Sequence, residues 1–534
     1  MTPPKKILMI TNSETGQSNV ILATAHALFE QDPTVQVHIA SFPQLEPAAK
    51  KALAHVQDGR FAFHALPGPA FSEVYNRDPD PANTLLHGSL VKPSIASTPH
   101  LTRFFLAKLF YTWTTEEFVA LFDAARDLIE KTVRPDICVV EGYLTPALTA
   151  MMHVHAHAHA HRFRATVMLP TSLKDVAGHL EPGTAMLTKW PVVGSALPMP
   201  IPWYYVPLNA YFFVRMVLVL VRDETPARYE AAVRAATGIP DLDVLSYGAV
   251  VSHPTAFGVE RIFVGSRAEV DFPQLDLESP PRGYMERVVA CGPILRASPA
   301  LREVDPELAA WMGGEPVVYV NLGTMCRVSE DEAVDMARAL KQVLDVAGTN
   351  MKTKHGAACA EPERRGQEMR VLWKIKKDPT RGPPYGTGPG SKVYDVFREE
   401  MEADPPRVRI SEWLDAEPMA ILSTGDAVCA VTHGGANSFY EAIAAGVPQV
   451  VLPVWGDTYD YANRAELLGI GRWGSRKGCP RWYVSELAPV LAEVVLERNA
   501  EFAAKSRALA EVCRRDGGGR NVAARKILAL AEEK

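Results

Sequence analysis

Short apolar runs alternate with segments of helical spacing along most of the chain. KILMIT, VQVHIAS and DICVVE have the continuous apolar character of buried strands, and NVILATAHALFEQ and LTPALTAMM between them carry apolar residues at helical intervals. The alternation begins again in the second half with PVVYVNLG, MRVLWKI, AVCAVT and PQVVLPV. Strands that alternate with helices predict parallel sheets covered on both faces. The predicted fold class is therefore α/β, with two doubly wound lobes.

The boundary between the lobes is predicted in a segment rich in proline and charge, ILRASPALREVDPEL. The N-terminal lobe would cover residues 1–293, followed by a linker over 294–312. The C-terminal lobe would cover 313–515. A last helix within 516–534 is expected to pack back on the N-terminal lobe.

Composition excludes several functional classes. The 534 residues are 47% hydrophobic with a net charge of -6, so the chain lacks the dense basic surface that binds nucleic acid. Its seven cysteines include no C-x-x-C pair, which argues against a disulfide framework or a zinc knuckle. The N-terminal ILMI is too short for the core of a signal peptide. We expect a cytoplasmic protein.

One apolar segment complicates this picture. Residues 190–221 contain a single charged side chain, Arg215, and are interrupted by five prolines. The prolines argue against one continuous membrane-spanning helix. The pattern predicts a helix buried against the lobe or lining an apolar pocket. Contact with a membrane surface, which would make the protein peripheral to a membrane, is the alternative.

Two patterns resemble metal sites. Histidines alternate with valine or alanine from His153 to His161, and they would share one face of a strand but scatter around a helix. Because catalytic zinc is generally held by ligands from different elements, we interpret this run as a loop or helix end. Asp78 and Asp80 flank a proline in a polar loop and predict a turn. The sequence thus predicts no metal site.

The strongest candidate for chemistry is VTHGGANSFYEA, residues 431–442. It predicts a buried strand, a glycine turn and a helix capped by Asn437 or Ser438. A helix N-terminus at the carboxyl edge of a parallel sheet binds anions, so the pattern favours phosphate. Ser438 and Glu441 have the spacing of a capping box, which would stabilise the helix with no ligand.

The context of this motif resembles the donor-binding signature of family 1 UDP-dependent glycosyltransferases. HGGANS followed by LPVWGDTYDYANRAE is most similar to fungal members, and YVNLGT and ACGPIL also resemble the family. The resemblance implies the GT-B fold, in which two Rossmann-like lobes border a cleft. It also implies that the lobe of residues 1–293 binds the acceptor and that the lobe of residues 313–515 binds the UDP-sugar donor. The residues that match in order are Trp413, His433, Gly434, Gly435, Asn437, Ser438, Glu441, Gly446, Pro448, Pro453 and Asp457.

The resemblance also implies roles for these residues. Trp413 would stack on uracil, and Glu441 would accept hydrogen bonds from the ribose hydroxyls. Asp457, followed by Thr458, would bind the sugar. The residues implied near the diphosphate are Gly323, Thr324, His433, Gly434, Gly435, Asn437 and Ser438. Because hydrogen-bond donors would stabilise the leaving diphosphate, neither a metal nor a cofactor is expected.

Three positions depart from the family pattern. Plant members have glutamine where this chain has Thr458, and tryptophan where it has Ala436. The sugar is therefore left open, with glucose as the first expectation. The segment WLDAEPMAIL is also longer than the usual W-x-P-Q spacing, so no glutamine is placed there.

The general base also departs from the family pattern. Gln17 occupies the position of the usual histidine, and Glu141 occupies that of its aspartate partner. Because glutamine does not accept a proton, we expect Glu141 to be the base, with Gln17 beside it. His87, His100 and His64 are the alternatives.

These observations predict inverting, metal-independent transfer of a hexose from a UDP-sugar to a hydroxyl of a small apolar acceptor. A phenolic, polyketide, terpenoid or lipid would suit the apolar segments. One alternative is a protein that binds UDP-sugar without turnover. A Rossmann oxidoreductase is disfavoured because the first turn lacks G-x-G-x-x-G. A sugar epimerase with the same donor lobe stays open.

Overall fold

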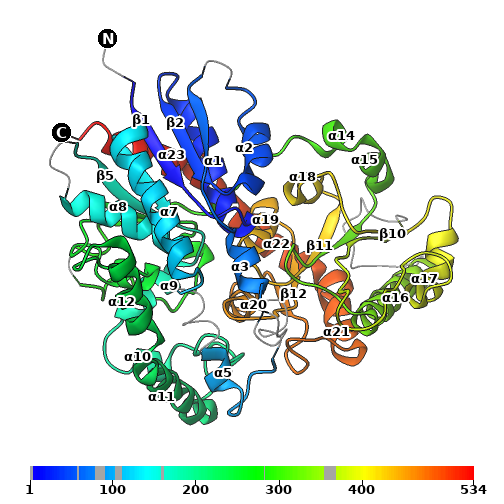
Figure 1. The fold of residues 1–534 in the computed structure, drawn as a ribbon. Helices are drawn as coiled ribbons and strands as arrows, with labels where there is room; N and C mark the ends of the chain where they lie inside the picture. The colour runs from blue at the N-terminus through cyan, green and yellow to red at the C-terminus, as the bar shows by residue number, and fades with distance from the viewer. Residues whose placement is uncertain are drawn as a thin grey trace.

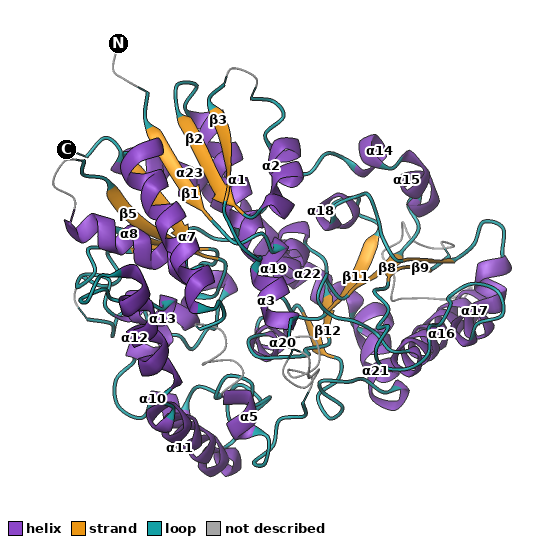
Figure 2. Ribbon diagram, viewed as in Figure 1, coloured by secondary structure: helices purple, strands orange, loops and turns teal. Residues whose placement is uncertain are grey.

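The computed structural model has two α/β lobes, each built on one parallel sheet (Figure 1). It describes residues 4–56, 59–78, 84, 91–102, 111–157, 161–281, 283–353 and 368–533. In Figure 2 the N-terminal sheet lies at the upper left and the C-terminal sheet to the right of centre. The predicted class, α/β with two doubly wound lobes, is confirmed.

The N-terminal sheet has seven parallel strands in the order β3-β2-β1-β4-β5-β6-β7. Its central strands β1 and β4 are buried along almost their whole length, because helices cover both faces. This explains their continuous apolar runs. The strands are β1 (Lys6–Ile10), β2 (Gln36–Ser41), β3 (Phe61–Ala65), β4 (Ile137–Glu141), β5 (Arg164–Leu169), β6 (Arg261–Val264) and β7 (Val288–Ala290).

The C-terminal sheet has six parallel strands in the order β10-β9-β8-β11-β12-β13. Here too the central strands, β8 and β11, are fully buried. The strands are β8 (Val317–Asn321), β9 (Arg370–Lys374), β10 (Val408–Ser411), β11 (Ala427–Thr432), β12 (Gln449–Val451) and β13 (Gly471–Trp473).

Helices flank the sheets of both lobes (Figure 1). In the N-terminal lobe they are α1 (Thr15–Gln31), α2 (Glu46–Ala52), α3 (Phe71–Asn76), α5 (Thr98–Thr102), α7 (Thr115–Asp127), α8 (Thr145–His157), α9 (Leu173–Ala177), α10 (Ala185–Thr188), α11 (Val206–Arg222), α12 (Thr225–Thr237) and α13 (Tyr247–Ser252). From there on they are α14 (Leu301–Val304), α15 (Pro306–Met312), α16 (Glu330–Thr353), α17 (Lys392–Glu402), α18 (Pro418–Leu422), α19 (Ala436–Ala445), α20 (Thr458–Leu467), α21 (Val484–Ala492), α22 (Asn499–Arg514) and α23 (Gly519–Leu530).

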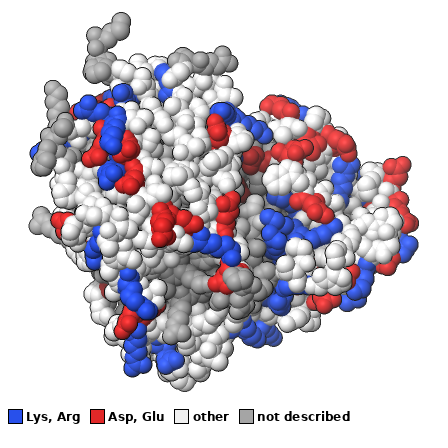
Figure 3. Space-filling view, in the orientation of Figure 1, with Lys and Arg blue, Asp and Glu red and all other residues white. Residues whose placement is uncertain are grey.

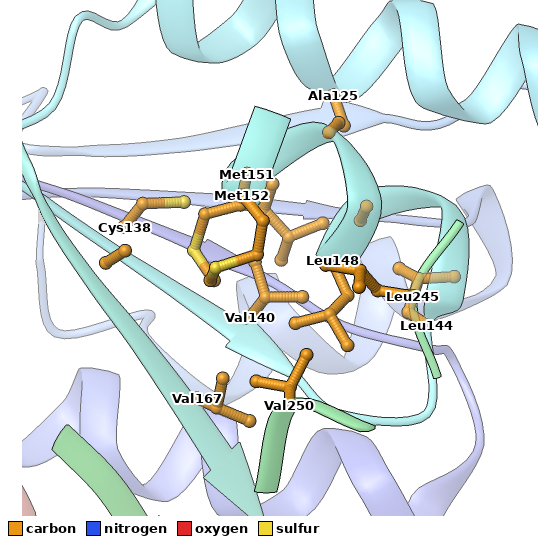
Figure 4. Packing of buried hydrophobic residues seen from close by; sticks show 14 of the residues in the cluster. Ala125, Cys138, Val140, Leu144, Leu148, Met151, Met152, Val167, Leu245 and Val250 are labelled. Atoms are coloured by element: carbon orange, nitrogen blue, oxygen red, sulfur yellow. The ribbon is translucent and has the colours of Figure 1, made fainter. Parts of the chain in front are cut away.

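The core of the N-terminal lobe contains apolar side chains of α8 that pack against those of β4 and β5. In Figure 4, Leu148 and Met151 of α8 lie over Cys138 and Val140 of β4, and Val167 of β5 lies beside them. All five side chains are buried. Burial of one such side chain stabilises the fold by roughly 1.5–3 kcal/mol. Helix α8 is thus buried on nearly all sides from Thr145 to Met152, where it packs on the apolar residues of β4.

Both sheets reverse their strand order near the middle, between β1 and β4 and between β8 and β11. Ligands of open parallel sheets bind beyond the carboxyl ends of the strands at such switch points. In this chain those ends lead into the turn after Ile10, into Glu141, into the loop after Asn321 and into His433. The topology thus brings the predicted catalytic and donor residues to sheet edges where a ligand site is expected.

The segments near the lobe boundary differ from the predicted organisation in one respect. Residues 301–312, which were assigned to the linker, form α14 and α15. Their Trp311 and Met312 pack with Val317 of β8, so they are part of the C-terminal lobe. At the chain end, α23 lies against α1, with Ile527 in the core of the N-terminal lobe (Figure 1).

Two buried or partly buried ion pairs join the lobes. Arg464 of α20 lies 3.1 Å from the carboxylate of Asp271. Lys174 of α9 lies 2.5 Å from the carboxylate of Asp460, also on α20. Asn463 of the same helix accepts a hydrogen bond from the backbone N–H of Met199. Helix α20 therefore contributes a residue to each of these three contacts between the lobes.

The apolar segment 190–221 folds differently from the main expectation. In α11 only Asn209 and Phe212 are buried, and most of the other apolar side chains are exposed. The prediction of a buried or pocket-lining helix is wrong for the outer face of α11, because no neighbouring element in the described chain covers it. The histidine run begins on a helix, since α8 extends through His157.

Candidate active site

The glycine turn after β11 leads directly into α19. Gly435 is the N-cap and makes no side-chain cap hydrogen bond, and the helix starts at Ala436. Asn437 and Ser438 therefore lie inside the first turn, so the prediction that one of them caps the helix is wrong. The Ser438–Glu441 capping box is likewise not formed, because Ser438 is not the N-cap. The first-turn N–H groups are left for another acceptor, as an anion site requires.

The imidazole of His433 is enclosed by two glycines. A Cβ at Gly435 would lie 2.5 Å from Nε2 of His433, and a Cβ at Gly323 would lie 2.7 Å from its Cε1. The ring of Trp455 lies 5.7 Å away between centroids. Burial lowers the pKa of His433 to about 4. At neutral pH this ring is therefore uncharged, and its buried Nδ1 has no hydrogen-bond partner among the described residues.

The loop after β8 lies beside this imidazole. Its backbone is held by Asn321, whose Oδ1 accepts from the N–H of Gly323 at 3.0 Å. Gly323 has a φ of 79°, which favours glycine. The exposed Lys376, two residues beyond β9, donates from Nζ to the carbonyl of Thr324 at 2.8 Å. A positive charge is thus present beside the glycine turns.

Two candidates for nucleoside binding lie on neighbouring elements. Trp413, just after β10, is 68% exposed, and Nζ of Lys374 lies 4.6 Å from the centre of its ring. Glu441, on α19, is partly buried. Desolvation, with a further contribution from Glu417, raises the pKa of Glu441 to about 8. An exposed aromatic face and a desolvated carboxyl group are therefore both available for a ligand.

The last donor candidates, Asp457 and Thr458, have different environments. Asp457 is exposed, and desolvation together with Asp175 and Asp460 raises its pKa to about 7. Thr458 is buried, and its hydroxyl accepts from the N–H groups of Val454 and Trp455. The Thr458 hydroxyl thus holds the turn, whereas the Asp457 carboxyl is open to a ligand.

On the N-terminal side, Glu141 ends β4 and has no solvent exposure. Its two carboxyl oxygens accept from Nδ2 of Asn12 and from the N–H of Tyr143, each at 3.0 Å. Burial raises its pKa to about 8, and the charge of Glu14 contributes to this increase. The side chain beside Glu141 is thus Asn12, where Gln17 was expected.

A second carboxylate near Glu141 is that of Glu14, which lies in the turn between β1 and α1. Its Oε1 accepts from the N–H of Ser72 at 2.7 Å, and its buried Oε2 has no hydrogen-bond partner among the described residues. The next residue, Thr15, accepts a hydrogen bond through its carbonyl from Nδ2 of Asn437 at 2.9 Å. The turn after β1 therefore touches the first turn of α19 directly, and the catalytic and donor candidates meet where the lobes meet.

Comparison with known proteins agrees with this geometry. Residues 404–472 match the family model described as UDP-glucoronosyl and UDP-glucosyl transferase. Glycosyltransferase sdnJ of Sordaria araneosa is 30% identical over 539 residues, which cover 96% of this chain and 95% of that relative. The chain is a UDP-glycosyltransferase. Erythritol-mannosyl-transferase 1 of Mycosarcoma maydis is 24% identical over 262 residues, covering 43% of this chain and 42% of that protein.

Solved structures of other glycosyltransferases have the same fold. A UDP-glucosyltransferase from Polygonum tinctorium superposes with a TM-score of 0.60 at 16% identity and covers 100% of both chains. A Medicago truncatula enzyme complexed with UDP-glucose has a TM-score of 0.59 at 15% identity, with 99% of this chain and 98% of that chain covered. The predicted GT-B architecture is thereby confirmed.

Within this UDP-glycosyltransferase, the predicted donor residues all follow carboxyl ends of strands in one sheet. They come from the loops after β8, β10, β11 and β12, from α19 and from the first residue of α20. Sequence reasoning missed Lys376 and Glu14. The available signal was their position, two residues after β9 and four residues after β1, where parallel sheets place functional side chains. His87, one of the alternative bases, lies outside the described residues. His64 is instead hydrogen-bonded to His38 at 3.0 Å.

Gly435→Ala is expected to weaken UDP binding about tenfold, the equivalent of one good hydrogen bond. The φ of Gly435 is -69°, so alanine fits the backbone, but its Cβ would displace the imidazole of His433. Calorimetric titration with UDP measures the effect. Gly388→Ala is the matched control, because a Cβ there meets no atom within 4 Å. Unchanged UDP affinity in Gly435→Ala would show that the position of His433 does not matter for the donor.

Proposed function

We propose that this UDP-glycosyltransferase transfers a hexose, with glucose as the first choice, from a UDP-sugar to a hydroxyl of a small apolar acceptor with inversion. The observation that carries the proposal is the contact of Asn437 with Thr15, which brings the donor helix to the turn beside Glu141. A base on one side and a leaving diphosphate on the other suit a single in-line displacement. Such a displacement inverts the anomeric carbon.

The donor would be held by three kinds of group. Trp413 offers a ring face for uracil, and Glu441 offers a carboxyl group for the ribose hydroxyls. The first-turn N–H groups of α19, with Asn437 and Ser438, would hold the diphosphate. Because Lys376 adds a positive charge beside Thr324, the negative charge that develops on the diphosphate would be stabilised without a metal.

Glu141 is the proposed general base. A buried carboxyl group with a pKa of about 8 is well matched to proton removal near neutral pH. The acceptor oxygen would form its bond to the anomeric carbon as the bond to the diphosphate breaks, and the acceptor proton would pass to Glu141. Glu14 is the competing carboxylate, because one of its oxygens has no partner among the described residues. Gln17, half-buried in the first turn of α1, would contact the acceptor.

The proposed acceptor class follows from the apolar character of the N-terminal lobe and from the solved relatives. The Polygonum tinctorium structure is a complex with 3,4-dichloroaniline, and a structure of a Phytolacca americana protein of the same fold contains pterostilbene. Asp457 is the residue proposed to bind the sugar hydroxyls. Thr458 would act only through the turn that its hydroxyl holds. We place the enzyme in the cytoplasm, where the six cysteines that the structure describes, all free, would stay reduced.

The deciding test is UDP release from UDP-glucose in the presence of EDTA, across a panel of phenolic and lipid alcohols. Acceptor-dependent release, with a product of inverted anomeric configuration by NMR, would support the proposal. A mannose donor is included because one relative is named as a mannosyl-transferase. UDP binding without release from any donor would favour a binding protein without turnover.

Trp413→Ala is expected to weaken UDP binding about tenfold or more, because stacking of a base on an aromatic ring contributes roughly 1–3 kcal/mol. Tyr483→Ala is the matched control, since Tyr483 is another exposed aromatic residue of the C-terminal lobe. Titration with UDP and with uridine compares the two variants. An equal effect in both variants, or none in Trp413→Ala, would exclude Trp413 as the uracil platform.

A further inference from the structure

Helix α11 carries its apolar residues on the outside. Tyr211, Val214, Leu218 and Val221 are spaced three, four and three residues apart, so they form one stripe along the helix. All four are exposed, and Val221 reaches 78%. A surface helix ordinarily turns such a stripe toward the core. The amphipathic pattern of α11 is therefore reversed, and the exposed stripe is available for a partner.

The helix is nevertheless held firmly on the lobe. Asn209, on its inner face, has no solvent exposure. Its Oδ1 accepts from the N–H of Val192, and its Nδ2 donates to the carbonyls of Leu187 and Trp190, all at 2.9 Å. Phe212 is buried on the same side. These contacts orient the apolar stripe away from the protein.

The helical stretch Trp203–Thr237 contains an 18-residue window with a mean hydropathy of 1.6, which makes it a candidate membrane span. Two features argue that it does not cross a bilayer. Helix α11 ends at Arg222 after 17 residues, which corresponds to about 25 Å and is shorter than the ~30 Å hydrocarbon core. Spanning would also break the three hydrogen bonds of the buried Asn209. The length and the anchoring of α11 therefore fit a helix that lies along the surface of a bilayer.

The flanking residues match the chemistry of a lipid headgroup region. Trp203, Tyr204 and Tyr205 precede α11, and all three rings are exposed, Trp203 by 84%. Tryptophan and tyrosine are enriched at this depth of a bilayer because one end of the ring is apolar and the other is polar. A consecutive trio of exposed rings at the end of an apolar stripe is therefore an interfacial pattern.

One basic side chain of α11 is placed to contact lipid phosphates. Helix α11 contains Arg215 and Arg222 and no acidic residue, although Asp223 and Glu224 follow it directly. Arg222 is exposed on one border of the apolar stripe, where a long side chain can reach lipid phosphates while its stem stays in apolar surroundings, whereas Arg215 is partly buried. In Figure 3 the lower end of the molecule, where Figure 1 places α11, is mostly uncharged, with both basic and acidic residues near its edge.

We propose that α11 and the aromatic residues 203–205 bind the headgroup region of a phospholipid bilayer, with α11 parallel to the membrane plane. The partner is a lipid surface with anionic headgroups. The binding surface belongs to the N-terminal lobe and is separate from the donor residues. The inference does not depend on the sugar or the acceptor of the proposed reaction.

The test is flotation of the full-length protein with vesicles of phosphatidylcholine alone and of phosphatidylcholine mixed with phosphatidylserine. We expect binding to the mixed vesicles, and Val221→Glu to lower the partition coefficient about tenfold or more, because it places a carboxylate in the apolar stripe. Arg222→Gln should lower binding to the mixed vesicles about fivefold and leave binding to neutral vesicles nearly unchanged.

Val346→Glu is the matched control, since Val346 is a valine of the C-terminal lobe that is 46% exposed on α16. It should float like the unmodified protein. Thermal unfolding without vesicles shows that each variant is folded. Failure of the unmodified protein to float would overturn the proposal. So would light scattering that shows a dimer abolished by Val221→Glu in a protein that does not float, because the stripe would then join two copies of the chain.

Discussion

Glu141→Gln is expected to lower kcat about a hundredfold to ten-thousandfold while the Kd for UDP stays unchanged. The amide cannot take the acceptor proton, and Glu141 is in the N-terminal lobe, on the opposite side of the lobe contact from the donor residues. The variant should fold, because burial keeps the pKa of Glu141 at about 8, so the native group is mostly neutral at pH 7. Asn12 has an Oδ1 without a partner in the described chain, and rotation of its amide would accept the new N–H.

The pH dependence gives a second readout of this variant. If Glu141 is the base, kcat of the unmodified enzyme should rise as the pH increases through about 8, where the carboxyl group loses its proton. The contribution of the Glu141 carboxyl group to the free energy of unfolding changes in the opposite direction, because it decreases as the pH rises. Because the folded pKa is raised from 4.5 to about 8, the contribution is fully present below pH 4.5 and is lost as the pH rises through 8. The side chain of Glu141→Gln does not ionise, so the variant keeps this stability and should be more stable than the unmodified enzyme at pH 9.

Glu14→Gln, measured in the same assays, separates the two carboxylates. Glu14 contributes charge near Glu141, so its removal should shift the kinetic pKa downward and reduce kcat only modestly. If Glu141→Gln retains full turnover and Glu14→Gln loses it, the base is Glu14. If both variants retain turnover, neither carboxylate removes the proton.

Arg464→Met is expected to lower the free energy of unfolding by about 3–5 kcal/mol, because it leaves the buried carboxylate of Asp271 without its charged partner. Arg464 is 1% exposed, and Asp271 is completely buried. The guanidinium also lies 4.4 Å from the ring centre of Tyr461 and 4.7 Å from that of Phe439. Methionine fills part of the volume but supplies no charge and no hydrogen bond.

The measurement is thermal unfolding, with an expected decrease in Tm of about 3–5 °C. Arg515→Ala is the control, because the Arg515–Glu269 pair also connects distant parts of the chain, at 3.0 Å, but has side chains that are 57% and 40% exposed. An exposed pair contributes about 1 kcal/mol or less. Equal decreases in Tm for the two variants would mean that the buried pair does not stabilise the contact between the lobes.

Some features of this enzyme were predictable because they depend on short segments. The strands β1, β4, β8 and β11 are buried on both faces, so each needs a continuous apolar run, and such a run can be recognised locally. The glycine turn at Gly434 was predictable for a similar reason. Its φ is 79° and a Cβ would lie 2.8 Å from Val451, so the backbone there requires glycine.

Other features could not be read from local patterns. The helix start at Ala436, in place of Asn437 or Ser438, depends on how the turn leaves β11. The side chain beside Glu141 is Asn12 because β1 and β4 are neighbours in register, whereas Gln17 lies one helical turn farther along. The Thr458 hydroxyl resembles a ligand group in the sequence, yet the turn at Trp455 uses it.

The sequence by itself determined the two-lobed α/β class and the donor motif, because both depend on residue type and spacing within continuous segments. The tertiary structure decided which side chains meet across the lobes, among them Asn437 with Thr15 and Arg464 with Asp271. It also decided that the apolar stripe of α11 points outward. Helical spacing specifies that a stripe exists, but only the packing of the other face, here through the buried Asn209, determines its direction.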